Sequence, residues 1–210
     1  MKRLLATFVL LVAGPLALAD GLESLETFMR TTQSARADFT QVVTSPTRDG
    51  QAARQKTSSG SFEFQRPGRF RFVYKKPFEQ VIVADGQTLW FHDVDLNQVT
   101  RRSQARALGS TPAALLASAP DLQALRADFT LSSAPDQDGL QWVLAVPKAK
   151  DGQLQSVRVG LRDAQLAVLE ILDGFGQRSV IRFSGLQANL QLPPSAFQFK
   201  PPAGVDVLSQ

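Results

Sequence analysis

Few residues in this chain of 210 could take part in catalysis. The sequence contains one histidine, His92, and no cysteine, which excludes thiolate nucleophiles, disulfide bonds and zinc–cysteine sites. A histidine-based triad would depend on the His92–Asp93 pair, at the end of an alternating segment where a turn begins. The sequence has no Gly-x-Ser-x-Gly elbow and no Ser-x-x-Lys motif. We therefore expect no enzymatic activity, no cofactor and no metal site, with a secreted hydrolase that uses His92 as the alternative.

The most basic segment, residues 69–76, reads Arg-Phe-Arg-Phe-Val-Tyr-Lys-Lys and combines cations with aromatic rings. This composition is typical of RNA-binding strands, in which exposed rings stack on bases beside cations. In a strand, however, alternate side chains point to opposite faces. The rings of Phe70, Phe72 and Tyr74 would therefore face away from the arginines. We expect no nucleic-acid partner.

The N-terminus has the features of an export signal. Lys2 and Arg3 precede an apolar segment over residues 4–13, and alanines three and one residues before the proposed cut fit an Ala-x-Ala cleavage site. The apolar segment is too short to span a bilayer. We predict that residues 1–19 are a signal peptide cleaved after Ala19.

The rest of the chain is predicted to form one soluble domain, residues 20–210. Without the two cations of the leader, the net charge falls from +4 to +2, which is too small for the strong field that binds a phosphate backbone. A lipoprotein would carry its acylated cysteine where Asp20 stands, so we expect a protein without a lipid anchor. Its predicted location is the periplasm of a Gram-negative bacterium.

Short alternating segments separated by turns dominate the sequence. Asp-Gly pairs, the strongest short-range hairpin signal, occur at residues 49–50, 85–86, 138–139, 151–152 and 173–174. Strands are predicted at residues 36–44, 60–65, 69–74, 80–84, 88–92, 97–102, 127–131, 140–146, 154–161, 167–172, 178–183 and 197–200. Apart from residues 110–119, no helical segment lies between them, so no α crossovers support a parallel sheet. The pattern therefore predicts one large antiparallel sheet, curved or partly closed.

Two helical segments are expected to cover the concave side of this sheet. Over residues 21–33, apolar side chains recur at helical spacing and form one stripe. Over residues 110–119, Thr111 is a suitable N-cap, Pro112 suits the first helical turn, and Pro120 ends the segment. This second helix is short and apolar, so docking on the sheet must stabilise it.

Large apolar side chains would gather on the inner face of the sheet. Such a set is compatible with a well-packed core and equally with a cavity for an apolar ligand. The inward groups that the alternation predicts are Phe62, Phe64, Phe70, Phe72, Tyr74, Trp90, Trp142, Val157, Val159, Leu161, Leu169, Ile171, Ile181 and Phe183.

Motifs spread over the chain resemble the LolA family, the periplasmic carriers of outer-membrane lipoproteins. The similarity is carried, in order, by Asp-Phe-Thr-Gln at 38–41, Arg-Pro-Gly-Arg-Phe-Arg-Phe at 66–72, Pro77, Val-Ala-Asp-Gly-Gln-Thr-Leu-Trp at 83–90, Asp-Leu-Asn-Gln-Val-Thr at 95–100, Thr-Pro at 111–112 and Phe-x-Phe-x-Pro-Pro-x-Gly-Val at 197–205.

The resemblance implies a mainly β fold with short helices. It implies an incomplete antiparallel barrel of about eleven strands, with an α-helical lid over an apolar cavity. It further implies that Arg66 hydrogen-bonds backbone carbonyls of the lid and holds the lid closed. Without the resemblance, Arg66 would be interpreted as a surface cation in a turn. The lid-gating residues are then Arg66, Pro112, Ala113, Leu116 and Ala117.

The acyl-chain cavity is assigned to Leu25, Met29, Phe70, Phe72, Ile82, Trp90 and Leu116. The resemblance implies a monomeric chaperone that binds the acyl chains of lipoproteins. An inner-membrane ABC-type lipoprotein-releasing complex would load it, and an outer-membrane receptor lipoprotein similar to LolB would unload it. The alternative is another periplasmic lipid- or lipoprotein-binding or sensing module of the same fold.

Overall fold

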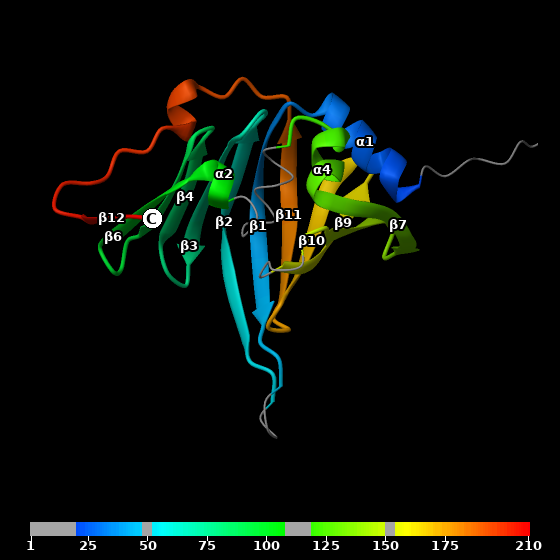
Figure 1. The fold of residues 1–210 in the computed structure, drawn as a ribbon, viewed down its shortest axis with the longest axis horizontal. Helices are drawn as coiled ribbons and strands as arrows, with labels where there is room; N and C mark the ends of the chain where they lie inside the picture. Colours follow the sequence, from blue (N-terminus) through cyan, green and yellow to red (C-terminus); the bar gives the residue numbers. More distant parts are fainter. Residues whose placement is uncertain (1–19, 48–51, 108–118, 150–153) are drawn as a thin grey trace, which may run out of the picture.

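A computed structural model gives the structure of the chain and describes residues 20–47, 52–107, 119–149 and 154–210. Within these residues, one twelve-stranded sheet curves across the molecule (Figure 1). The strands are β1 (Ser34–Thr44), β2 (Gln55–Gln65), β3 (Arg69–Lys76), β4 (Gln80–Asp85), β5 (Thr88–Asp93), β6 (Gln98–Ser103), β7 (Phe129–Gln137), β8 (Leu140–Pro147), β9 (Leu154–Arg162), β10 (Gln165–Asp173), β11 (Arg178–Ala188) and β12 (Asp206–Ser209).

The sheet is open, with the order β12-β6-β5-β4-β3-β2-β1-β11-β10-β9-β8-β7. Strands β1 to β11 pair antiparallel with their neighbours, and β12 adds to β6 in parallel. This arrangement confirms the prediction of an incomplete antiparallel barrel. The predicted strand at residues 197–200 is wrong, because Phe197 ends the 3₁₀ helix η2 (Pro194–Phe197) and residues 198–200 follow it without pairing.

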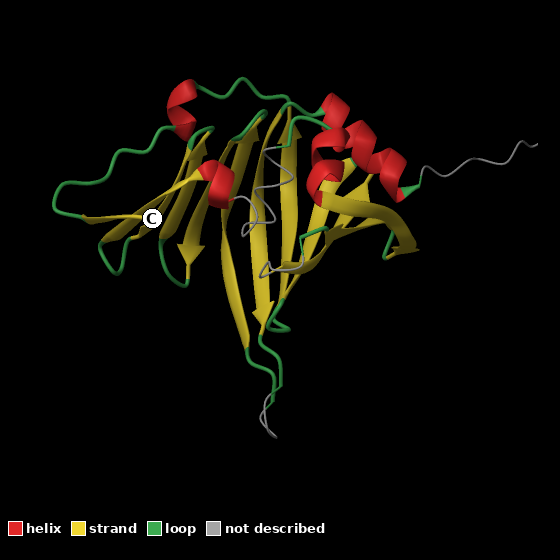
Figure 2. Ribbon diagram, viewed as in Figure 1, coloured by secondary structure: helices red, strands yellow, loops and turns green. Residues whose placement is uncertain are grey.

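Helices α1 (Gly21–Thr31) and α4 (Leu122–Asp128) lie on the concave face, against strands of the β7–β10 half (Figures 1 and 2). Asp20 caps α1, where its carboxylate accepts from the backbone N–H of Glu23 at 2.9 Å. Asp121 caps α4 in the same way through Ala124, at 2.8 Å. The prediction of a helix at 21–33 is confirmed with an earlier end, while α4 and the short α2 (Gln104–Ala107) were not predicted.

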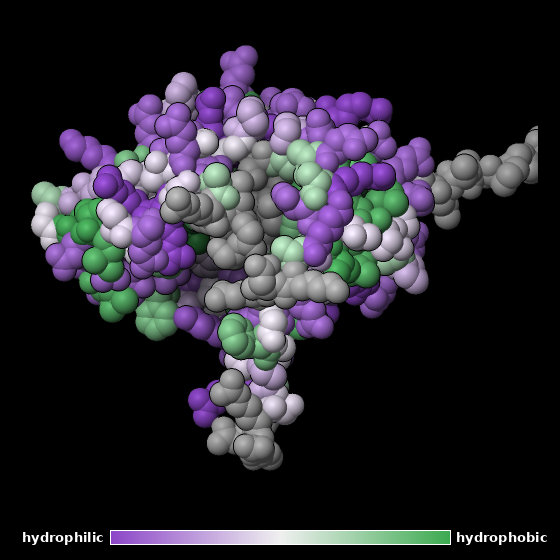
Figure 3. Space-filling model, in the orientation of Figure 1, coloured by the Kyte–Doolittle hydropathy of each residue, from purple (hydrophilic) through white to green (hydrophobic). Residues whose placement is uncertain are grey.

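The predicted helix at 110–119 lies almost wholly outside the described residues, and with it Pro112, Ala113, Leu116 and Ala117. No helix in the described part of the chain has the length and hydrophobicity of a membrane span. In space-filling view the face that carries the helices is mostly hydrophilic at its rim (Figure 3). Hydrophobic groups reach the surface at the edge formed by β6 and β12, where Val207 is 45% and Leu208 is 44% exposed.

Candidate functional site

The concave face of β1–β5 carries apolar side chains in ordered rows, because directly paired residues of antiparallel strands share a face. The first row lies next to the β2–β3 turn. The second row lies two residues further from that turn along each strand. The rows are Ala35, Phe64, Phe70, Ala84 and Leu89, and then Ala37, Phe62, Phe72, Ile82 and Phe91.

These rows form the aromatic centre of the core. The rings of Phe62 and Phe72 stack with centroids 4.3 Å apart, and Phe39 meets Phe72 edge-on at 5.5 Å. Phe70 and Phe72 are 0% and 2% exposed. The sequence prediction that the rings of residues 70, 72 and 74 share one face, opposite the arginines, is confirmed by the strand pairing.

Helix α1 contributes the facing side of the same apolar cluster. Leu25, Phe28 and Met29 are each 1% exposed, and they belong to one cluster with the aromatic rows. Phe28 lies edge-on to Phe64, with centroids 6.3 Å apart. The structure therefore brings the predicted Leu25 and Met29 together with Phe70 and Phe72, and Ile82 packs against this cluster with partial exposure.

Trp90 requires a correction. Its partner on β4 is Val83, whereas Leu89 and Phe91 pair with the inward residues of that strand. Trp90 thus lies on the outer face, where its ring packs on Phe199 with centroids 5.5 Å apart. Strand alternation puts Trp90 and Phe72 on different faces of the sheet, so Trp90 does not belong to the concave lining.

Arg66 is buried at the end of the aromatic rows that lies beside the β2–β3 turn. It directly follows β2 and is 7% exposed. Its Nε donates to the carbonyl of Thr32 at 3.0 Å, and one terminal nitrogen donates to the carbonyl of Ala119 at 2.8 Å. The guanidinium also lies over the rings of Phe28 and Phe64, 5.4 and 5.0 Å from their centroids. Arg66 therefore joins the end of α1 to the residue that follows the segment 108–118.

Several features keep this cation in place. Thr32 is the C-cap of α1, and carbonyls at a helix C-terminus favour a positive charge. The two rings add cation–π attraction. Burial lowers the pKa of Arg66 from 12.5 to about 10, so the group stays charged at neutral pH. The interpretation as a surface turn cation is excluded by this burial.

A pocket of about 360 Å³ opens beside Arg66, and its described lining includes Pro67, Gly68, Gly86, Ala119 and Leu125. Gln104 connects the two turns at this mouth. Its side-chain amide donates to the carbonyl of Gly68 at 2.6 Å and accepts from the N–H of Gly86 at 3.0 Å. We did not predict a role for Gln104, because nothing in its local sequence indicates that it is 3% exposed.

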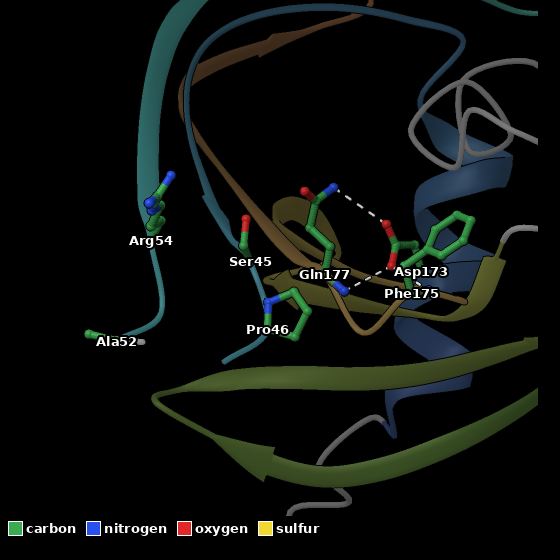
Figure 4. A pocket seen from close by; sticks show the side chains of 7 residues that line it. All are labelled: Ser45, Pro46, Ala52, Arg54, Asp173, Phe175 and Gln177. Atoms are coloured by element: carbon green, nitrogen blue, oxygen red, sulfur yellow. Dashed lines mark hydrogen bonds between the residues drawn. The ribbon is translucent and has the colours of Figure 1, made fainter. Parts of the chain in front are cut away.

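A second pocket, of about 520 Å³, lies at the opposite end of β1 and β11 (Figure 4). Its lining is mainly polar and includes Ser45, Arg54, Asp173 and Gln177. The Asp173 carboxylate accepts from the backbone N–H groups of Phe175 and Gln177 at 2.9 and 2.8 Å, which fixes the β10–β11 turn. This arrangement is that of a turn and offers no apolar surface comparable to the aromatic rows.

His92 is a buried residue that packs on an aromatic ring. It is 9% exposed and lies within β5 on the outer face, with its ring 5.7 Å from that of Phe199. Among the described residues, no group of three or more His, Cys, Asp or Glu side chains could hold a metal ion.

Comparison with known proteins agrees with this geometry. The family model for the outer membrane lipoprotein carrier protein LolA matches residues 30–200. An outer-membrane lipoprotein carrier protein of Albidiferax ferrireducens is 66% identical over 209 residues, with 98% of each chain covered. One from Methylibium petroleiphilum is 53% identical over 201 residues, which cover 96% of this chain and 95% of the relative.

Solved structures support the fold. A LolA superfamily protein from Nitrosomonas europaea superposes with a TM-score of 0.52, covering 85% of this chain and 96% of that one. Its sequence is only 12% identical, so this likeness concerns the architecture alone.

Proposed function

Since the chain belongs to the LolA family of outer membrane lipoprotein carrier proteins, we propose that it shields the acyl chains of lipoproteins in the periplasm. The acyl chains lie on the concave face, in contact with Leu25, Met29, Phe70, Phe72 and Ile82. The protein binds and releases its cargo without making or breaking covalent bonds.

The observation that carries this proposal is the position of Arg66 at the end of the aromatic rows beside the β2–β3 turn, where it binds carbonyls on both sides. We infer that the segment after α2, including Pro112, Ala113, Leu116 and Ala117, acts as a lid over these rows. Arg66 already binds the carbonyl of Ala119, directly after that segment. Its hydrogen bonds therefore favour the closed position of the lid.

The free energies of acyl-chain burial and of a charged hydrogen bond are compatible with a lid that opens reversibly. Burying an acyl chain is worth about 0.8 kcal/mol per methylene, or on the order of 12 kcal/mol for a chain of roughly fifteen. Several chains that each contributed this full burial free energy would dissociate too slowly for a carrier. A hydrogen bond from a charged donor contributes about 1.5–3 kcal/mol, so Arg66 favours closure, and thereby release, without locking the protein shut.

The remaining parts of the proposal concern the pathway. The signal peptide is removed after Ala19, and residues 20–210 act as a monomeric single domain. An inner-membrane ABC-type complex loads the carrier, and an outer-membrane receptor lipoprotein similar to LolB receives the cargo.

The Arg66→Leu variant tests the gate. We expect a normal circular dichroism spectrum and normal uptake of lipoprotein from membranes that contain the releasing complex. Transfer from carrier to receptor should fall by about tenfold, equivalent to about 1.4 kcal/mol of lost preference for the closed state. The measurement is the fraction of radiolabelled lipoprotein that moves to liposomes carrying the receptor.

Two matched variants complete this experiment. Arg66→Lys keeps the charge but loses the fork that reaches two carbonyls, so its transfer should be intermediate. Arg182→Leu removes an exposed cation of β11 and should transfer normally. Normal transfer by Arg66→Leu would exclude a gating role for this side chain.

A further inference from the structure

The aromatic rows of the concave face end at a line of polar side chains. The third row across β1–β5 consists of Phe39, Gly60, Tyr74, Gln80 and Asp93. It contains three polar side chains, whereas the first two rows contain none.

These polar groups form two hydrogen-bonded sets, one of which extends to β1 and β11. The amide of Gln80 donates to the carboxylate of Asp93 at 3.1 Å. The Tyr74 hydroxyl donates to the side-chain oxygen of Gln41 at 3.0 Å, and the Gln41 amide donates to the Ser179 hydroxyl at 2.7 Å. We call Tyr74, Gln80, Asp93, Gln41 and Ser179 the polar belt.

The polar belt is partly buried. Ser179 is 9% exposed, and the Tyr74 ring packs edge-on against Phe39 with centroids 4.9 Å apart. Burial raises the pKa of Tyr74 to about 12. Buried hydrogen-bonded groups resist separation, because each partner left alone would lose its bond without gaining one to water.

What lies on the two sides of the polar belt differs in polarity. On the side of Arg66 are the two apolar rows. The row farther from the polar belt contains Phe70, four strand residues from Tyr74 and about 13 Å away. On the other side, β1 and β11 lead to the mainly polar pocket lined by Ser45, Arg54 and Asp173 (Figure 4).

We infer that the polar belt is the floor of the acyl-chain site and sets the length of chain that the carrier accommodates. A methylene that reaches the floor gains no further apolar contact unless it breaks Tyr74–Gln41 or Gln41–Ser179. The floor therefore selects against long chains and keeps chain ends from the solvated far end. This inference rests on the proposed function of acyl-chain binding.

The test uses synthetic diacylated lipopeptides that share one peptide and differ only in acyl-chain length. For the wild type, affinity should rise about fourfold per methylene, equivalent to about 0.8 kcal/mol, and then reach a plateau. In the Tyr74→Phe, Gln41→Leu double variant the plateau should move to longer chains by at least two methylenes. Affinity for the short chains should not change.

A variant with the opposite effect and a matched control make the result specific. Ile82→Gln adds a polar group in the second row and should move the plateau to shorter chains. Trp90→Phe removes a ring nitrogen from the outer face of the same sheet and should leave the plateau in place. Tyr74→Phe alone removes a single oxygen and replaces the double variant if that variant does not fold.

The outcomes separate the two proposals. A plateau at the same length in the wild type and in the belt variants would overturn the floor while leaving lipoprotein binding intact. Failure of the wild type to bind any of the lipopeptides would overturn both.

Discussion

Strands β4 and β5 carry large apolar side chains on both faces, but the two faces are covered in different ways. On the outer face, Val83 and Val99 are 0% exposed, beneath η2 and the segment that follows it, including Phe197 and Phe199. On the concave face, α1 packs against the aromatic rows, and Arg66 ties it to Ala119. Both faces are therefore packed, but the concave one is also joined by hydrogen bonds from a buried charged side chain.

Under the proposed function, this difference separates a structural core from a binding surface. A face closed by a tightly packed aromatic ring opens only when that part of the protein unfolds. Under the proposed function, a segment held over the concave face by the hydrogen bonds of Arg66 can open while the sheet stays folded. Removing the covering side chain should therefore lower the stability of the protein on the outer face, at Phe197, and impair lipoprotein transport on the concave face, at Arg66.

The largest effect on stability is expected for Phe197→Ala. Phe197 is 1% exposed, and truncating a buried phenylalanine costs about 3–5 kcal/mol of the free energy of unfolding. Urea denaturation followed by tryptophan fluorescence measures this loss. Affinity for an acylated peptide, measured in buffer where the variant is folded, should stay within twofold of the wild type.

Phe175→Ala is the matched control, since that ring is 70% exposed and its removal should cost less than about 0.5 kcal/mol. If folded Phe197→Ala lost its affinity for acylated peptide, the outer face would belong to the binding site and the comparison would fail.

An intermediate effect is expected from the titration of Tyr74, the only tyrosine in the chain. Its pKa is raised from 10.0 to about 12 by burial, so between these values the unfolded state binds fewer protons than the native state. Stability should therefore fall as pH rises from 10 to 12, by about 2–3 kcal/mol, and be unaffected by Tyr74 below pH 10.

Two measurements check this prediction. The tyrosinate absorbance of the native protein should appear near pH 12, and that of the urea-unfolded chain near pH 10. The alkaline loss of stability should be smaller in Tyr74→Phe. Arg66, whose pKa is lowered, acts in the opposite direction over this range, but it is present in both proteins and cancels in the comparison. A native midpoint near 10 would contradict the burial of the polar belt.

The smallest effect is expected for His92→Phe. The side chain packs on Phe199 at the outer face, and an exchange of similar shape should change stability by less than about 1.5 kcal/mol. Uptake and transfer of lipoprotein should be unchanged. Loss of transport in a folded His92→Phe variant would instead favour the enzymatic alternative.

Local signals in the sequence were enough to predict most of the sheet. Asp-Gly at 85–86 and 138–139 marks turns in the structure, and the alternation in residues 69–76 gives the correct face for each side chain. Arg66 differs, because its burial depends on contacts with Thr32 and Ala119, which are far away in the sequence. The family resemblance, and no local pattern, indicated its role.

The wrong predictions for Trp90 and for a strand at residues 197–200 also arise because the deciding contacts are not local. In β5, Leu89 and Phe91 alternate with Trp90 and His92, so both faces look apolar and the sequence does not decide which is concave. Residues 197–200 have the pattern of a strand, but β12 occupies the place beside β6, and Phe197 and Phe199 pack on the outer face instead. Whether such a segment becomes an edge strand depends on which sheet edges are free, and this is a property of the folded sheet.

An open sheet also raises the question of self-association, since the backbone groups of an edge strand can pair with another chain. At one end of the described sheet, β7 contains Pro135 and an irregular register between Ala134 and Gln137; proline lacks the N–H that a new partner would need. At the other end, β12 spans only four residues. Both ends thus discourage strand addition, so the carrier can keep a wide, half-open sheet without polymerising.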